Sequence, residues 1–141
     1  MQAVEQRALE GAAEDLHKEA NMDSTATIDS LKNRVRAFCE ARDWDQFHGP
    51  KDLAIGVATE ASELLEHFRF MNDEEAASRL AEPDRRAAIE DEIADVLFFV
   101  LRFAQRFDVD LDSALEHKIK KNDDRYPVDK ARGSNLKHDE L

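Results

Sequence analysis

Two pairs of acidic residues lie inside apolar helical runs, and they constrain the fold more than any other feature of this chain. The first pair is Glu60 and Glu63, and the second is Glu92 and Asp95. Each pair is spaced i, i+3, so on a helix both carboxylates leave one face about a turn apart. Carboxylates beside a core repel one another and lose water, so they need a cation or protons. The pairs therefore predict two neighbouring helices whose acids gather around a hard divalent cation with oxygen ligands, Mg2+ above all.

The alternatives to a magnesium site differ in how well the surrounding residues fit them. Acid pairs arise by chance in a chain with 32 Asp and Glu, but Glu60 and Asp95 fall where the apolar stripe predicts core residues. A di-iron carboxylate bundle needs Glu-x-x-His motifs on its paired helices. The only such motif is Glu14 to His17, although His67, four residues after Glu63, leaves a mixed site open. Oxygen-only ligands favour Mg2+ or Mn2+ over iron or zinc.

The composition predicts a single all-α domain. A chain of 141 residues with only 4 Gly and 3 Pro has few turn formers, which favours a bundle of four to five helices. A formal net charge of -12 argues against a surface that binds a nucleic-acid polymer, which would be basic. It does not exclude one nucleotide bound through a metal. The single cysteine, Cys39, offers no disulfide or cysteine-based zinc site, and we expect it to be a small buried residue.

Apolar periodicity and turn residues divide the chain into helical segments. The helices are expected over residues 2–20, 27–42, 50–70, 73–80, 85–107 and 111–122. We interpret residues 1–25 as an acidic N-terminal arm, 26–127 as the domain and 128–141 as a polar tail that is extended over the surface. Residues 96–101 are apolar all round, so that helix is central in its own domain or packs on a second chain. With so few helices to surround it, we favour a homodimer or homotetramer.

The sequence contains no recognisable targeting or membrane segment. Residues 1–23 lack an apolar signal core, and no apolar run reaches about 18 residues. We therefore expect no membrane association and a cytoplasmic location. The last four residues, 138–141, match an endoplasmic-reticulum retention address, which has no use without an export signal.

The acidic motifs resemble those of a known family. The pattern Glu60-x-x-Glu63 followed by Glu92-x-x-Asp95 is similar to the E-x-x-E…E-x-x-D signature of the MazG-like, all-α nucleoside triphosphate pyrophosphatases. Residues 42–48 resemble the loop before the first acidic helix in the dCTP pyrophosphatase branch, and residues 118–133 resemble its C-terminal segment. The resemblance covers roughly residues 27–141. It implies an oligomeric helical bundle in which the four acids bind Mg2+ and a nucleoside triphosphate is hydrolysed to the monophosphate and pyrophosphate.

The resemblance also implies a set of substrate contacts. Trp44 and Phe47 offer stacking faces for a base, and His48 offers a hydrogen bond. Phe70 stands where the branch would place a second tryptophan, and Phe99 stands where it often shows a tyrosine. The remaining candidates lie near the phosphates or base and are Lys118, Lys121, Asn122, Arg125 and Tyr126. The alternative for these basic residues is a lysine-rich helix C-terminus favoured by the helix dipole, which explains Lys120 better than it explains Lys121 with Asn122.

Two functions follow from the sequence. The first is a pyrophosphohydrolase of nucleotide-pool housekeeping that acts on dCTP or a modified deoxynucleotide. The second is a non-enzymatic helical interaction module, in which the acidic arm and the apolar face over residues 96–101 bind a partner. Selectivity for a base depends on the shape of the pocket, which the sequence does not specify.

Overall fold

The structure, a computed structural model, describes residues 22–141, and every regular element among them is a helix. The all-α prediction is therefore confirmed for this part of the chain. The predicted helix over residues 2–20 lies outside the described residues. The elements are η1 (Met22–Ser24), α2 (Ile28–Glu40), η2 (Trp44–Phe47), α3 (Pro50–Glu66), α4 (Asp73–Ala81), α5 (Pro83–Arg106), α6 (Leu111–Arg125) and α7 (Val128–Ala131).

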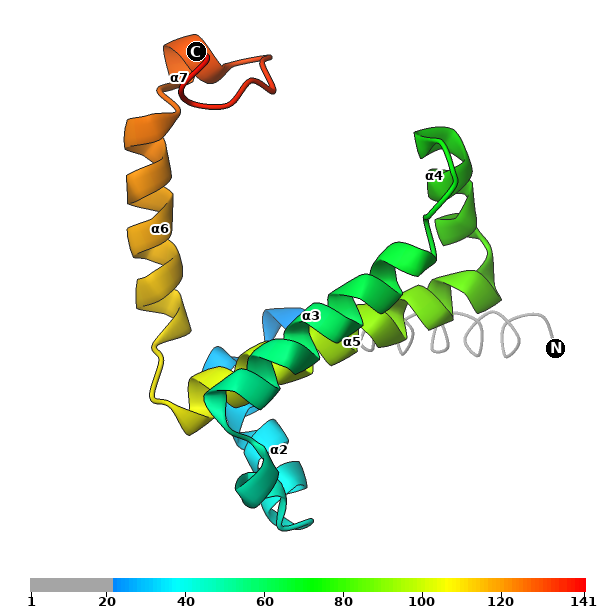
Figure 1. Cartoon of the computed structure of the whole chain (residues 1–141), viewed down its shortest axis with the longest axis vertical. Helices are drawn as coiled ribbons and strands as arrows, with labels where there is room; N and C mark the ends of the chain where they lie inside the picture. Colours follow the sequence, from blue (N-terminus) through cyan, green and yellow to red (C-terminus); the bar gives the residue numbers. More distant parts are fainter. Residues whose placement is uncertain (1–21) are drawn as a thin grey trace, which may run out of the picture.

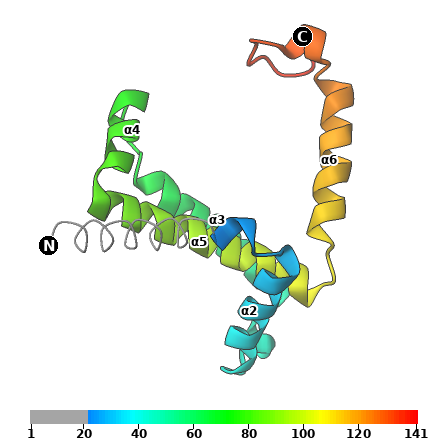
Figure 2. The same cartoon turned by 180° about the vertical axis from the view of Figure 1, so that it is seen from behind.

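An antiparallel pair of long helices, α3 and α5, forms the centre of the fold (Figures 1 and 2). The short helix α4 connects them at one end and packs on α5, while α2 packs on the other half of α5. Because the two long helices run in opposite directions, the C-terminal half of α3 lies against the N-terminal half of α5. The acidic segments of both helices are in these halves, so the pairing brings them together.

The helix boundaries follow local capping chemistry. Thr27 caps α2, because its side chain accepts a hydrogen bond from the Ser30 N–H, and Pro50 occupies the first turn of α3. The predicted helix over residues 50–70 is too long, since α3 ends at Glu66. A turn over residues 67–70 follows, and Phe70 has a φ of 66°, which a right-handed helix cannot contain.

The buried core is small, and its residues come from α2, α3 and α5. Its fully buried apolar residues, among those described, are Cys39, Leu53, Ile89, Leu101 and Ala104. The expectation that Cys39 is buried is confirmed. Other apolar side chains on α5 remain open to solvent, since Ile93 is 51% exposed and Leu97 is 46% exposed. One chain therefore leaves part of the apolar surface of α5 uncovered.

Helix α6 stands away from the α3–α5 pair in both views (Figures 1 and 2). Leu115 and Ile119 on α6 are more than half exposed. The sequence predicts an extended tail after α6, and this prediction is wrong in part. Val128–Ala131 form the short helix α7 after Pro127. The Ala131 N–H donates to the Pro127 carbonyl at 2.8 Å, which closes this single turn. Within residues 22–141, no helix is both long enough and apolar enough to cross a membrane.

Gly56 sets how closely α3 approaches α5. A Cβ built at Gly56 would lie 2.4 Å from Cδ1 and 2.8 Å from Cγ of Phe99, so the whole ring would have to move. We expect Gly56→Ala to lower the free energy of unfolding. Overpacking costs about 1–3 kcal/mol, and the better helix propensity of alanine offsets at most about 1 kcal/mol of this cost. Urea unfolding measures this difference. The double variant G56A/F99L should recover part of the loss, and strictly additive effects of the two substitutions would contradict the contact.

Candidate active site

Three carboxylates meet where α3 and α5 pair. Glu60 and Glu63 come from α3 and Glu92 comes from α5, and one oxygen of each lies within 4.8 Å of the others. Glu60 and Glu92 are partly buried, whereas Glu63 is exposed. Three oxygen donors at this separation match the chemistry that a hard divalent cation requires. We refer to Glu60, Glu63 and Glu92 as the acid triad.

Asp95, the fourth predicted ligand, lies beside the triad rather than within it. It is exposed, although the apolar stripe had suggested a core position. Its charge nevertheless reaches Glu60. Burial raises the pKa of Glu60 first of all, and the charges of Glu63, Asp95 and Glu92 raise it further. A group whose charge is opposed by desolvation and by three neighbouring acids is one that a bound cation would stabilise.

His67 borders the acid triad on the side of the turn after α3. Its Nε2 lies 3.8 Å from Oε1 of Glu92, and both side chains are 20% exposed. The two side chains form an ion pair only if the imidazole is protonated, and the distance is too long for a hydrogen bond. The histidine is therefore close to the triad without belonging to it.

A cavity of about 720 Å³ connects the acids to an aromatic wall. Its lining includes Glu60 and Asp95 on one side and Trp44, Phe98 and Phe99 among its apolar residues. The rings form a connected series, since Phe38 contacts both Trp44 and Phe98 edge to face, with centroids 5.7 and 5.8 Å apart. An aromatic cavity that opens onto carboxylates has the size and chemistry of a small-molecule site.

A buried arginine of α5 holds the loop that carries Trp44. Arg102 is completely buried, and its guanidinium pairs with the Asp45 carboxylate and donates from Nε to Nδ1 of His48 at 3.0 Å. Its Nη1 donates to Oε1 of Gln105. Arg106 adds a second contact, with its Nη1 3.2 Å from Oδ2 of Asp45. Sequence analysis missed both arginines, although Arg102 interrupts the apolar run of α5, which was the one available signal.

His48 has a structural contact in this loop as well as a predicted substrate role. Its Nδ1 accepts the hydrogen bond from Arg102, so the ring proton of the neutral imidazole lies on Nε2. Burial lowers the pKa of His48, and the charge of Arg102 lowers it further. Phe47, the next predicted contact, is 62% exposed and does not line the cavity.

The other predicted substrate residues fall into two groups. Phe99 lines the cavity together with Trp44. Phe70 does not, since it is 91% exposed beyond the end of α3 and has the Arg69 guanidinium 4.7 Å above its ring. The residues at the C-terminal end of α6 and just beyond it also lie away from the α3–α5 pair: Lys118, Lys121, Asn122, Arg125 and Tyr126. One chain therefore brings together the acids, Trp44 and Phe99 but not these polar and basic groups.

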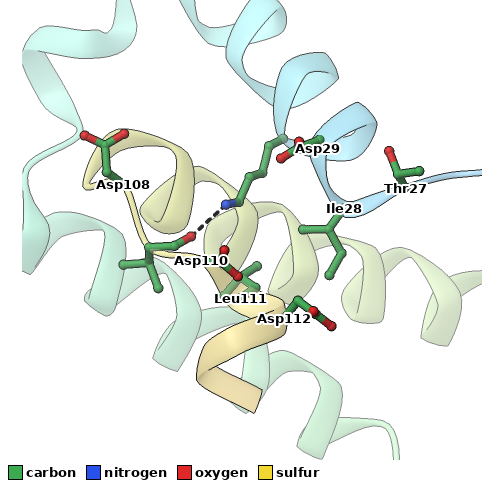
Figure 3. Close-up of a pocket in the computed structure, with 9 residues that line it drawn as sticks. Thr27, Ile28, Asp29, Asp108, Asp110, Leu111 and Asp112 are labelled. Atoms are coloured by element: carbon green, nitrogen blue, oxygen red, sulfur yellow. Dashed lines mark hydrogen bonds between the residues drawn. The ribbon is translucent and has the colours of Figure 1, made fainter. Parts of the chain in front are cut away.

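A second cavity, of about 590 Å³, contains none of the predicted site residues. It lies between the start of α2 and the turn from α5 to α6, and it is lined by Lys32 and several aspartates (Figure 3). The Lys32 Nζ donates to the Val109 carbonyl at 2.7 Å, the dashed line in Figure 3. Asp110 caps α6, because its carboxylate accepts from the Ser113 N–H at 2.9 Å. These contacts fix the point from which α6 leaves the rest of the fold.

The Asp45–Arg102 pair should make stability depend on pH. The hydrogen bond from Arg102 holds the pKa of Asp45 below its ordinary value. A carboxylate with a depressed folded-state pKa contributes stability that is present above its unfolded pKa, about 3.9, and is lost as the pH falls through the folded-state value. We expect Asp45→Asn to lower the melting temperature at pH 7, and the gap from wild type to shrink below about pH 4. A gap that stays constant from pH 7 to pH 3 would contradict this pairing.

Comparisons with known proteins show which family the chain belongs to. The chain is 36% identical to dCTP pyrophosphatase 1 from Rattus norvegicus over 115 residues, which is 82% of this chain and 68% of the rat protein. It has the same identity and coverage with dCTP pyrophosphatase 1 from Homo sapiens. Among solved structures, a pyrophosphatase from Archaeoglobus fulgidus matches with a TM-score of 0.66 and 33% identity, covering 70% of this chain and 91% of that one. Residues 55–141 match the model of the MazG-like family, and the chain belongs to that family.

Proposed function

We propose that this protein is a nucleoside triphosphate pyrophosphohydrolase of nucleotide-pool housekeeping. Water attacks the α-phosphorus, the bond from that phosphorus to the bridging oxygen breaks, and a nucleoside monophosphate and pyrophosphate leave. The observation that carries the proposal is the acid triad, one member of which, Glu60, also lines an aromatic cavity. The similarity to dCTP pyrophosphatases and to the archaeal pyrophosphatase supports the same reaction.

The acid triad fits a divalent cation. All its donors are carboxylate oxygens, they lie within 4.8 Å of one another, and burial disfavours the charge on Glu60. We propose that Glu60, Glu63 and Glu92 hold Mg2+, that Asp95 completes the set, and that Mn2+ can substitute. When bound, the cation neutralises the charge on the triphosphate and on the departing pyrophosphate.

Residues of the chain itself would bind the nucleoside, accept the proton of the attacking water and hold Trp44 in position. The cavity holds the nucleoside, with its base stacked against Trp44, and excludes water from one side of the substrate. One carboxylate of the acid triad accepts the proton of the attacking water, because these are the ionisable groups that face the phosphates. In this scheme Arg102 contacts neither the nucleoside nor the attacking water. It acts through Asp45 and His48, which hold the loop that carries Trp44 in place.

We propose dCTP or a modified deoxynucleotide as the substrate. The names of the related mammalian enzymes support this choice. Phe99, in place of the tyrosine of the resembled branch, keeps an aromatic ring in the cavity lining but removes a polar contact. The pocket is therefore more apolar than that of the branch, which favours a base with an apolar substituent.

We propose further that a homodimer or homotetramer completes the site. The exposed apolar residues of α5 and α6, including Ile93, Leu97, Leu115 and Ile119, support a second copy as the missing cover. The predicted phosphate contacts on α6 stand away from the acid triad of their own chain. In an assembly, α6 of one copy can supply Lys118, Lys121 and Asn122 to the acids of another.

Glu60→Gln should abolish the response to metal as well as the reaction. We expect Mg2+ to raise the melting temperature of the wild-type protein, because a ligand that binds only the folded state stabilises it. The variant should show little of this rise, and kcat/KM for dCTP should fall by about 100-fold or more, because a ligand of the cation that would stabilise the developing charge is lost. Thermal melting with and without Mg2+, and pyrophosphate release from a panel of triphosphates, measure the two effects.

Glu66→Gln is the matched control for this experiment. Glu66 is exposed on the same helix and pairs with Arg69 at 2.9 Å, outside the acid triad. It should keep the metal response and the activity. If the wild type releases pyrophosphate from none of the triphosphates with either Mg2+ or Mn2+, the enzymatic proposal is wrong and the interaction module is favoured.

A shared site can be tested by mixing two inactive variants. Glu60→Gln and Asn122→Ala should each be inactive alone. If Asn122 serves the acids of another copy, a mixed dimer contains one intact site of two. Purified mixed dimers should then show about half of the wild-type activity, and an unfractionated co-expression about a quarter by random pairing. Activity measured on doubly tagged, purified mixed oligomers checks this. No recovery in verified mixed oligomers would place Asn122 and Glu60 in the same chain's site.

A further inference from the structure

Arg34 brings a positive charge into the aromatic cavity. It lies on α2, and it lines the cavity together with Glu60 and Asp95. It is the only cationic residue in that lining among the described residues. The other described lining residues are apolar, aromatic or acidic, so Arg34 is the only charged hydrogen-bond donor among them.

Arg34 also differs from the other arginines between Ile28 and Arg106, because it has no partner among the described residues. Between Ile28 and Arg106, it forms no hydrogen bond, ion pair or ring contact with any described residue. The other arginines in this range each contact a carbonyl, an amide or carboxylate oxygen, a histidine nitrogen or a ring: Arg36, Arg42, Arg69, Arg79, Arg85, Arg86, Arg102 and Arg106. A guanidinium carries five donors in a fixed plane, and those of Arg34 are open to an incoming ligand.

The position of Arg34 indicates which part of a nucleotide it would meet. It belongs to the α2 side of the cavity, with Leu31, Val35, Phe38 and the loop residue Trp44. The acids belong to the opposite side, formed by α3 and α5. A nucleotide whose phosphates lie at the acids extends its base toward α2. The faces of the base stack on the aromatic side chains. Its polar edge is then free to accept hydrogen bonds from Arg34 on α2.

We infer that Arg34 is a specificity-determining residue that reads the base, an inference that rests on the proposed nucleotide hydrolysis. Two parallel N–H donors of a guanidinium match two adjacent acceptors. Among pyrimidines, cytosine presents such a pair in O2 and N3, whereas N3 of uracil and thymine carries a hydrogen. Arg34 therefore selects cytosine, because a uracil N3–H facing a donor leaves both groups unpaired.

Binding of nucleoside monophosphates tests this inference without hydrolysis. Calorimetry would measure the Kd of dCMP and of dUMP for the wild type, for Arg34→Met and for Arg34→Lys. We expect Arg34→Met to raise the Kd of dCMP about 10- to 100-fold, because a hydrogen bond from a charged donor is lost. The rise in the Kd of dUMP should be several-fold smaller. Arg34→Lys should raise the Kd of dCMP by an intermediate amount. Arg36→Met is the control, because Arg36 lies on the same helix, contacts Asn33 and does not line the cavity.

The steady-state ratio of kcat/KM for dCTP over dUTP gives the second readout. In Arg34→Met this ratio should fall about tenfold or more, mostly through KM, while the melting temperature stays that of the wild type. An equal loss for both substrates would show that Arg34 contacts phosphate and would overturn base recognition, as would unchanged affinity for dCMP. A wild-type protein that hydrolyses no nucleotide refutes the proposed function, whereas the dCMP and dUMP affinities still decide the role of Arg34.

Discussion

The buried charge of Arg102 is the constraint on which the arrangement of the site depends. A guanidinium without solvent is costly unless its donors are paired, and two of its partners, Asp45 and His48, come from the loop between α2 and α3. The loop must therefore close onto α5 for the core to form. Because Trp44 is in this loop, the closure that neutralises Arg102 also places an aromatic ring at the cavity. Folding of the core and formation of the nucleoside side of the site are thus the same event.

The same helix that anchors the loop also carries acids. Glu92 and Asp95 precede Arg102 on α5, so one rigid element fixes both the acidic and the aromatic ends of the cavity. The distance from Glu92 to the acids of α3 depends on how closely the two helices approach. Gly56 permits that approach, because Phe99 occupies the space that a side chain would fill. A change of packing at this glycine therefore alters the separation of the acid triad as well as the stability.

The sequence predicts the elements of this fold better than their arrangement. Apolar periodicity, Thr27 and Pro50 identify α2 and α3, and the i, i+3 spacing identifies the acids, since these signals are local. Arg102 was missed because its partner Asp45 is 57 residues away, and an arginine in a helix normally indicates a solvated face. The direction of α6 was also beyond prediction. A periodic pattern shows which face of a helix is buried but not the direction in which the helix runs. The contact of Lys32 with Val109, just before α6, helps to fix the direction of α6.

Charge adds a further requirement to the proposed reaction. The chain has a formal net charge of -12, and its substrate would be a polyanion that must approach a cluster of carboxylates. Attraction at close range can come only from groups that oppose this field. Among the described residues, the cavity lining offers a single such group, Arg34, which we assign to the nucleoside end. In the proposed reaction, the phosphate end would gain positive charge from a bound cation and from the basic residues of α6 in another copy. Nucleotide affinity should then depend on metal and on assembly together, because each supplies charge that the isolated chain lacks at that position.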